Sequence, residues 1–148
     1  MSTSLSDTDV SLRFPTRLYI YAVGGKIMDG EKTVLVVDDN FDFLVLVATI
    51  LRHSDLTILT AKSAMEAIHT LSESNIDLLI TDFNMPGMNG LELIQWCREK
   101  GKILPVILAT AQCGKFAQID VQLGDRFACV MGKPFLANVL RRTTLRAI

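Results

Sequence analysis

Short apolar stretches alternate five times with helix-like stretches from Thr33 onward. Strands separated by helices of about eleven residues are joined by crossover connections, which place the strands parallel in one sheet. The strand-like stretches are almost wholly apolar, as expected where helices cover both faces of the sheet. We therefore predict one α/β domain. The expected strands span 33–37, 56–60, 76–81, 104–109 and 127–131, and the expected helices span 41–52, 63–74, 90–100, 114–123 and 135–147.

Four of the strand-like stretches end in a reactive polar group. Asp38-Asp39 follow the first, Asp82 follows the third, Thr110 the fourth and Lys133 the fifth. In a parallel sheet these carboxyl ends share one edge, where open α/β sheets bind ligands. Each group alone has an ordinary explanation, such as an Asp that caps the next helix. Together, three carboxylates, a hydroxyl and an amine predict a phosphate-handling site with a divalent cation, for which Mg²⁺ suits the oxygen ligands.

These motifs resemble those of one protein family. The run Asp82–Gly90 (DFNMPGMNG) resembles the phosphoacceptor loop of bacterial response-regulator receiver domains, the chemotaxis-regulator type among them. Asp38-Asp39, Thr110-Ala111 and Lys133-Pro134-Phe135 resemble the family's other signatures, in the family's order and separation. The resemblance covers residues 31–148. It implies a flavodoxin-like, doubly wound sheet of five parallel strands in the order 2-1-3-4-5, with five helices.

The resemblance also implies a chemistry. Asp82 would accept a phosphoryl group from a phosphohistidine of a sensor histidine kinase or phosphotransfer protein. Lys133 would pair with the phosphoryl oxygens, and the Thr110 hydroxyl would bond one of them. The family members signal by altered protein–protein contacts. We expect no enzymatic activity beyond self-catalysed phosphotransfer and autodephosphorylation.

A metal set is implied for the same site. Asp39 and Asp82 would bind Mg²⁺ directly and Asp38 through water, while the backbone carbonyl of Asn84 would complete the protein ligands. Phosphoryl transfer depends mostly on positioning and charge neutralisation, which a metal and a lysine supply.

One position departs from the family pattern. Receivers often carry Tyr or Phe three residues before the lysine, and that ring moves inward with the threonine. This chain has Val130 there. Phe127 lies three residues earlier, and because side chains alternate along a strand we expect it on the other face.

The first expected helix is apolar nearly all round, although an amphipathic helix on a sheet should have a polar outer face. One explanation is burial by residues 18–23 of the amino-terminal arm or by a dimer partner. The other is a docking patch for a kinase or phosphotransfer helix bundle. We expect that patch to comprise Leu44, Val45 and Ala48.

The remaining composition narrows the class of protein. With 49% hydrophobic and 21% charged residues in 148, the chain is typical of one globular domain. A net charge of −1 without a basic stripe argues against nucleic-acid binding, and no apolar run reaches membrane-spanning length. Three scattered cysteines suggest reduced thiols in a cytoplasmic protein. Residues 1–30, which are neutral overall and begin rich in Ser and Thr, are expected to form a partly disordered extension or linker.

Three alternatives stay open at this point. The chain could be a non-phosphorylated scaffold that keeps the receiver fold, which Val130 would favour and the intact polar set opposes. It could also be a receiver module excised from a larger regulator or hybrid kinase. A phosphatase or hydrolase is less well supported, because His53 and His69 fall on outer helices where we expect them to face solvent. The downstream partner cannot be named.

Overall fold

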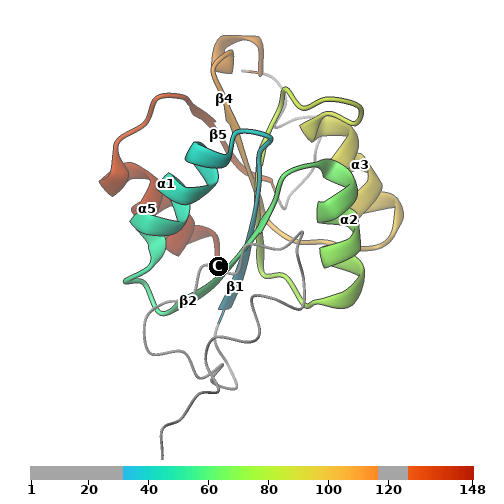
Figure 1. The fold of residues 1–148 in the computed structure, drawn as a ribbon, viewed down its shortest axis with the longest axis horizontal. Helices are drawn as coiled ribbons and strands as arrows, with labels where there is room; N and C mark the ends of the chain where they lie inside the picture. The colour runs from blue at the N-terminus through green and yellow to red at the C-terminus, as the bar shows by residue number, and fades with distance from the viewer. Residues whose placement is uncertain (1–31, 117–126) are drawn as a thin grey trace, which may run out of the picture.

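A central parallel sheet organises the computed structural model, which describes residues 32–116 and 127–148 (Figure 1). Its five strands follow the order β2-β1-β3-β4-β5, which confirms the predicted doubly wound topology. The strands are β1 (Lys32–Val37), β2 (Leu56–Ala61), β3 (Leu78–Asp82), β4 (Val106–Thr110) and β5 (Phe127–Gly132). The helices are α1 (Phe41–Leu51), α2 (Ala64–Glu73), α3 (Gly90–Glu99) and α5 (Ala137–Ala147), with a 3₁₀ turn η1 (Cys113–Phe116).

The element boundaries agree with the predictions to within two residues. β3 begins at Leu78 rather than at residue 76. Asp77, just before it, bonds Thr33 of β1 through both its backbone N–H and its carboxylate. β4 begins after Pro105, which has no N–H to donate to a sheet. The helix predicted over 114–123 falls mostly outside the described residues, and its first three residues lie in η1.

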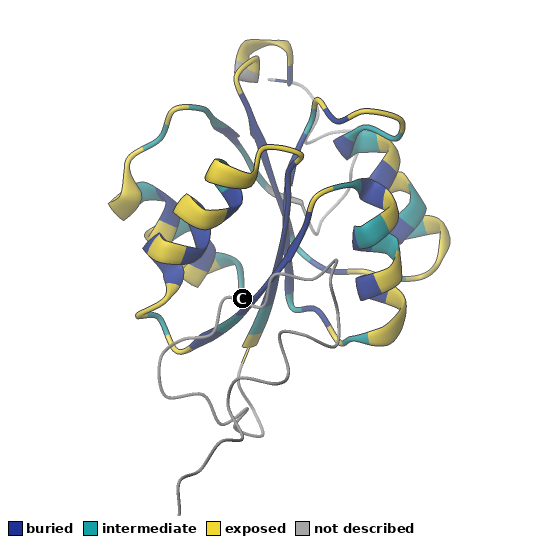
Figure 2. Ribbon diagram, in the orientation of Figure 1, coloured by how far each residue is buried: buried dark blue, intermediate teal, exposed yellow. Residues whose placement is uncertain are grey.

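Helices cover both faces of the sheet, α1 and α5 on one side and α2 and α3 on the other (Figure 1). Side chains alternate along each strand, so one strand supplies both cores. In β1, Val34 and Val36 join the core beneath α1 and α5, whereas Leu35 and Val37 join the core beneath α2 and α3. Figure 2 accordingly shows the strands buried along most of their length and the helices buried along their inner faces. Because helices cover both faces of the sheet, the ends of the described strands are where a site can form.

No α-helix in the described part of the chain has the length and apolar character needed to cross a lipid bilayer. The longest of them, α1 and α5, have 11 residues each.

The structure corrects the docking patch expected on α1. Leu44 and Ala48 are 0% and 1% exposed, because they lie on the helix face that packs on the sheet together with Val47 and Leu51. Residues spaced by three and four positions share one side of a helix, and this set follows that spacing. Val45 is the one predicted residue at the surface. The exposed large hydrophobic residues of α1 are Phe41, Val45 and Leu46, which we call the α1 patch.

The two faces of α1 predict opposite outcomes for the same substitution. Leu44→Ala opens a cavity in the core and should lower the free energy of unfolding by about 2–5 kcal/mol. Leu46→Ala removes a side chain that is 51% exposed and should change the same quantity by only about 0.5 kcal/mol. Urea denaturation of both variants measures the difference. Equal losses would mean that α1 does not pack on the face described here.

Candidate functional site

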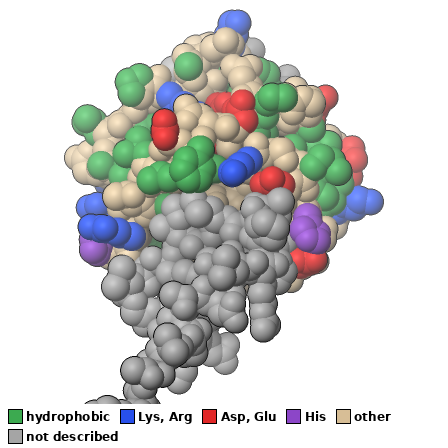
Figure 3. All heavy atoms as spheres, in the orientation of Figure 1, with side chains coloured by type: hydrophobic (Ala, Val, Ile, Leu, Met, Phe, Trp, Pro, Cys, Tyr) green, Lys and Arg blue, Asp and Glu red, His purple; other side chains and the backbone are tan. Residues whose placement is uncertain are grey.

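The carboxyl ends of the strands bring the predicted polar residues together. Asp38 follows β1, Asp82 ends β3, Thr110 ends β4 and Lys133 follows β5. The register aligns them, since Asp82 pairs with Ala109 on β4 and Thr110 pairs with Gly132 on β5. Figure 3 shows acidic side chains at several places on this face of the molecule, one group of them near its upper end, with hydrophobic side chains between them. The geometry therefore agrees with the cluster expected from the sequence.

Three carboxylates form the acidic part of the cluster. Asp38, Asp39 and Asp82 each place one oxygen within 4.8 Å of the others. Asp38 is 1% exposed and Asp82 is 9% exposed, whereas Asp39 is open to solvent. Oxygen ligands lie about 2.1 Å from an octahedral Mg²⁺, so the oxygens that share one ion lie about 3–4 Å apart. Small side-chain shifts would reach that spacing, so the donor set fits a hard divalent cation.

Lys133 connects two of these carboxylates. Its Nζ lies 2.5 Å from Oδ2 of Asp38 and 3.2 Å from Oδ1 of Asp82. The other Asp38 oxygen accepts a hydrogen bond of 2.8 Å from the backbone N–H of Asn40. Asp38 is thus held from both sides, by the amine of Lys133 and by the backbone of Asn40.

The backbone of Lys133 is tied to the neighbouring strand end. Its N–H donates to the carbonyl oxygen of Thr110 over 2.9 Å, and the Lys133-Pro134 peptide is cis. Thr110 is fully buried, and its Oγ1 accepts a hydrogen bond of 3.1 Å from the backbone N–H of Gln112. That bond uses the oxygen as an acceptor and leaves the hydroxyl proton available for a second partner. The threonine can therefore donate to an anion near the cluster.

Burial perturbs the titration of Asp82. Desolvation raises the pKa of this carboxyl above its ordinary value of 3.8, and the nearby charge of Asp38 acts in the same direction. The amine of Lys133 opposes both effects but does not cancel them. In the described structure, the ionised form of Asp82 is therefore less favourable than that of a carboxylate in water.

The loop after Asp82 packs closely against the strand end. A Cβ atom added to Gly90 would lie 2.1 Å from the carbonyl oxygen of Asp82, which no real contact permits. The N–H of Gly90 donates to the carbonyl of Phe83 over 2.9 Å, and the Asn89 side chain caps α3. Asn84 is exposed in this loop, and the role of its carbonyl as a metal ligand stays a prediction. The need for Gly90 was missed from the sequence.

An aromatic pair lies near the position where the family pattern is broken. Val130 is partly buried against the core beneath α2 and α3. Phe83, directly after Asp82, contacts Phe116 of η1 in the same core, with ring centroids 4.6 Å apart and an interplanar angle of 60°. The side chain of Phe127 lies outside the described residues. The sequence offered no periodicity that would pair Phe83 with Phe116.

A second aromatic group was also missed, although both of its members are visible in the sequence. Phe43 of α1 places its ring 3.8 Å from the Nζ of Lys133, measured to the ring centroid. Phe135 meets that ring edge-on, with centroids 5.7 Å apart. In the sequence Phe43 could be assigned only as one more apolar residue of the first helix.

Other reactive groups lie outside the cluster. His53 and His69 are both exposed, as predicted, and His69 lies 3.3 Å from Glu73 of the same helix. Cys97 is buried, which raises the pKa of its thiol to about 11, so it is protonated at neutral pH. These groups do not supply a second nucleophile for the site.

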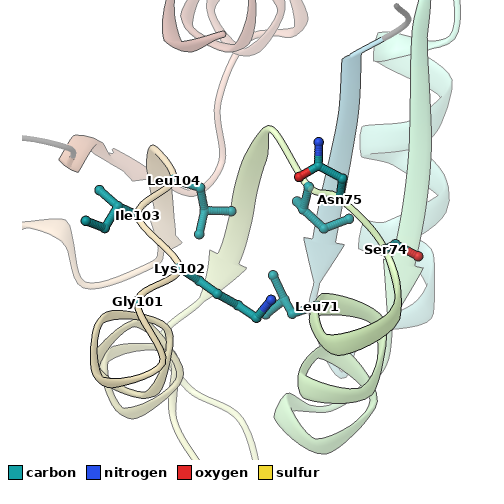
Figure 4. Close-up of a pocket in the computed structure, with 8 residues that line it drawn as sticks. Leu71, Ser74, Asn75, Gly101, Lys102, Ile103 and Leu104 are labelled. Atoms are coloured by element: carbon teal, nitrogen blue, oxygen red, sulfur yellow. The ribbon is translucent and has the colours of Figure 1, made fainter. Parts of the chain in front are cut away.

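A pocket lies elsewhere on the molecule (Figure 4). It has a volume of about 290 Å³ and lies before the starts of β3 and β4, at the sheet edge opposite to the carboxylate cluster. No carboxylate lines it, so it offers none of the chemistry of the cluster. Its lining residues are Leu71, Ser74, Asn75, Ile76, Gly101, Lys102, Ile103 and Leu104.

The chain is similar to known proteins. Residues 34–143 match the family model described as response regulator receiver domain. The chain is 34% identical over 111 residues to the chemotaxis protein CheY of Pseudomonas aeruginosa, and the alignment covers 73% of this chain and 89% of CheY. It is 40% identical over 113 residues to the sensor histidine kinase RcsC of Escherichia coli, and this alignment covers 76% of this chain but only 12% of RcsC.

A solved structure shows the same fold. The response regulator TrrA of Thermotoga maritima, in complex with Mg²⁺-BeF, superposes with a TM-score of 0.70 at 30% sequence identity. The match covers 79% of this chain and 99% of TrrA.

The raised pKa of Asp82 predicts a pH-dependent cost in stability. The folded protein holds the Asp82 proton more tightly than the unfolded chain does, so stability falls as pH rises from 3.8 through the folded pKa. Asp82→Asn should therefore raise the melting temperature by a few degrees at pH 7 without added metal. That gain should shrink as pH falls through the folded pKa of Asp82. Thermal unfolding at several pH values measures it.

Asp77→Asn is the matched control, because its effect should have the opposite sign. Burial acts to raise the pKa of Asp77, but hydrogen bonds from Thr33 and Lys32 outweigh it and hold the pKa below 3.8. The ionised carboxylate therefore stabilises the fold at neutral pH, and this stabilisation is lost as pH falls through the folded pKa. The control should melt lower than wild type at pH 7. A lower melting temperature for both variants would contradict the assignment for Asp82.

Proposed function

Because the chain belongs to the response regulator receiver domain family, we propose that it is a phosphorylation switch in which Asp82 accepts the phosphoryl group. The observation that carries this assignment is the contact of one amine, that of Lys133, with both Asp38 and Asp82 inside an acidic cluster. Asp82 ends a strand and begins the loop to α3, and burial raises the pKa of its carboxyl. Such a group is a candidate for chemistry rather than for structure.

The proposed reaction exchanges one bond for another. A carboxylate oxygen of Asp82 forms an O–P bond while the P–N bond of a donor phosphohistidine breaks, and its electron pair stays on the imidazole. The negative charge then moves outward from the Asp82 carboxylate to the phosphoryl oxygens. Lys133 lies 3.2 Å from Asp82 and can follow that charge, which is the stabilisation that phosphoryl transfer requires.

We assign the metal site to the same cluster. Asp39 and Asp82 would bind Mg²⁺ directly, Asp38 would hold it through water, and the Asn84 carbonyl would complete the set. When bound, the ion neutralises charge on the transferring group and on the carboxylates. Asp38 and Asp82 lie within 4.8 Å of each other, and among the described residues Lys133 is the cation that contacts them. The repulsion between their like charges supports this assignment.

Thr110 is the residue proposed to report the modification to the rest of the domain. Its hydroxyl proton is available for a phosphoryl oxygen, and its carbonyl accepts from the N–H of Lys133. A movement of Thr110 would thus act on the ends of β4 and β5 together. With Val130 in place of an aromatic residue, the relay beyond this point must use other side chains. Signalling then proceeds through altered contacts with a downstream protein.

The alternatives considered from the sequence are less well supported. A scaffold that is never phosphorylated gives no reason for an acid, hydroxyl and amine set with this geometry. The family match does not favour an excised module over a separate receiver. We infer that the chain acts as a phosphoryl acceptor without turning over a separate substrate, and that it works in the cytoplasm, where two-component phosphodonors are expected.

Receiver domains act with histidine kinases, and the α1 patch is the surface that we propose for that partner. Phe41 and Val45 lie four residues apart on one side of α1, and Leu46 extends the exposed area. The amino-terminal end of α1 is capped by Asn40, the residue after Asp39, so the patch borders the acidic cluster. A kinase or phosphotransfer helix bundle docked there would bring its histidine close to Asp82.

Phosphorylation can be tested directly. Incubation with acetyl phosphate and Mg²⁺ should add one phosphoryl group to the intact protein, measured by mass spectrometry. Asp82→Asn should abolish the adduct, because the accepting carboxylate is gone, and omission of Mg²⁺ should reduce it strongly. An adduct that persists on Asp82→Asn would refute the assignment of Asp82. If wild type gives no adduct, beryllofluoride binding distinguishes an inert scaffold from a receiver that requires a kinase.

The α1 patch makes a separate prediction about partner choice. Val45→Glu places a charge in the proposed interface and should slow phosphotransfer from a histidine kinase that phosphorylates wild type by roughly ten-fold or more. Phosphorylation by acetyl phosphate should be unchanged, because that donor needs no docking surface. Met65→Glu, at a residue of α2 that is 69% exposed, is the matched control and should leave both rates unchanged. Equal kinase rates for Val45→Glu and wild type would exclude the patch.

A further inference from the structure

We propose that Phe43 is a positioning residue for Lys133, which it holds by a cation–π contact; this inference rests on the proposed function. The ring centroid of Phe43 lies 3.8 Å from the Nζ of Lys133, well inside the distance of about 6 Å at which such contacts are effective. Neither the acidic cluster nor the loop of Asp82 supplies this contact. It comes from α1, an element otherwise assigned to packing and docking.

The ring of Phe43 is itself held in place. Phe135 meets it edge-on, at 5.7 Å between centroids and an interplanar angle of 75°, which is a preferred geometry for two aromatic rings. Both rings are partly buried against the core beneath α1 and α5. Phe135 lies two residues after Lys133, so the chain segment that carries the amine also carries the support for the ring. We call Phe43 and Phe135 the aromatic wall.

The aromatic wall differs from the other partners of the amine in one physical respect. Asp38 and Asp82 attract Lys133 by full charges, and the charge on Asp82 moves outward when it is phosphorylated. A phenyl ring attracts the amine through its quadrupole, which phosphorylation does not alter. The ring therefore offers an attraction whose source does not depend on whether Asp82 carries a phosphoryl group. Only 21% of the Lys133 side chain is exposed, which limits competition from water.

A purely packing role for Phe43 makes different predictions. Packing depends on the volume and shape of the ring, whereas a cation–π contact depends on its electron density. Fluorinated phenylalanines at position 43 weaken the ring quadrupole with little change of shape. Phe43→Leu removes the aromatic face and keeps an apolar side chain, and Phe43→Trp restores a face. Val139→Ala perturbs the same core, at a residue with no part in the proposed site.

The first measurement is the rate of phosphorylation by acetyl phosphate with Mg²⁺. Phe43→Leu should lower the rate roughly three- to thirty-fold, the span expected for loss of a partly desolvated cation–π contact. Phe43→Trp should recover most of it, and the rate should fall stepwise as fluorine atoms are added. Val139→Ala should keep the wild-type rate. A rate that ignores fluorination would overturn the proposal and leave Phe43 as a packing residue.

The second measurement needs neither metal nor phosphodonor. Urea unfolding of Phe43→Leu, Lys133→Met and the double variant forms a double-mutant cycle, and a contact between the two side chains should make their effects non-additive. Additive effects would show that the ring and the amine do not interact. The two proposals fail differently. Loss of the proposed function leaves wild type without an adduct whatever the cycle reports, whereas failure of this inference alone leaves a phosphorylated wild type, a flat fluorination series and an additive cycle.

Discussion

Repulsion between two neighbouring carboxylates, those of Asp38 and Asp82, is the constraint on which the site depends. A parallel sheet places the ends of β1 and β3 side by side, so Asp38 and Asp82 face each other in partly dehydrated surroundings. Their repulsion would favour protonation or separation unless a cation offset it. Lys133 supplies one positive charge, and a divalent ion or a phosphoryl–metal pair can complete the balance. The fold thus leaves an excess of negative charge at the carboxyl ends of the strands, which is where the charged group would bind.

The amine of Lys133 offsets this negative charge, and the groups that hold the lysine in place come from several helices and strands. Asp38 follows β1, Asp82 ends β3, Phe43 belongs to α1, and the backbone of Lys133 is fixed by Thr110 at the end of β4. A flexible lysine chain placed by one contact would sample many positions. Several weak and strong contacts around one amine restrict it to the cleft, and this restriction is what preorganised catalysis of phosphoryl transfer needs.

Much of the fold and of the polar cluster followed from the sequence, for a physical reason. In a strand of this kind, a few adjacent apolar residues predict that the strand is buried. The charged residue that follows them marks its carboxyl end. The buried face of α1 was different: with nearly every position apolar, composition could not tell Leu44 from Leu46, and only packing on the sheet separates them. Phe43 and Gly90 were missed because their roles depend on neighbours distant in the chain or on a backbone approach that no residue pattern announces.

The close approach of Gly90 to Asp82 makes the two sides of the site differ. The side towards α3 is rigid, and the side towards β4 is less so. The first residue of α3 touches the carbonyl of the proposed acceptor so closely that no side-chain atom fits between them. Backbone at residue 82 therefore has no room to yield towards α3. Thr110 and the loop that follows it present a different boundary, made of side chains and of hydrogen bonds that Thr110 accepts from the N–H groups of Gln112 and Lys133. This steric asymmetry gives a direction to any displacement. A bulky group added to Asp82 can displace the β4 side of the cleft, whereas the α3 side stays in place.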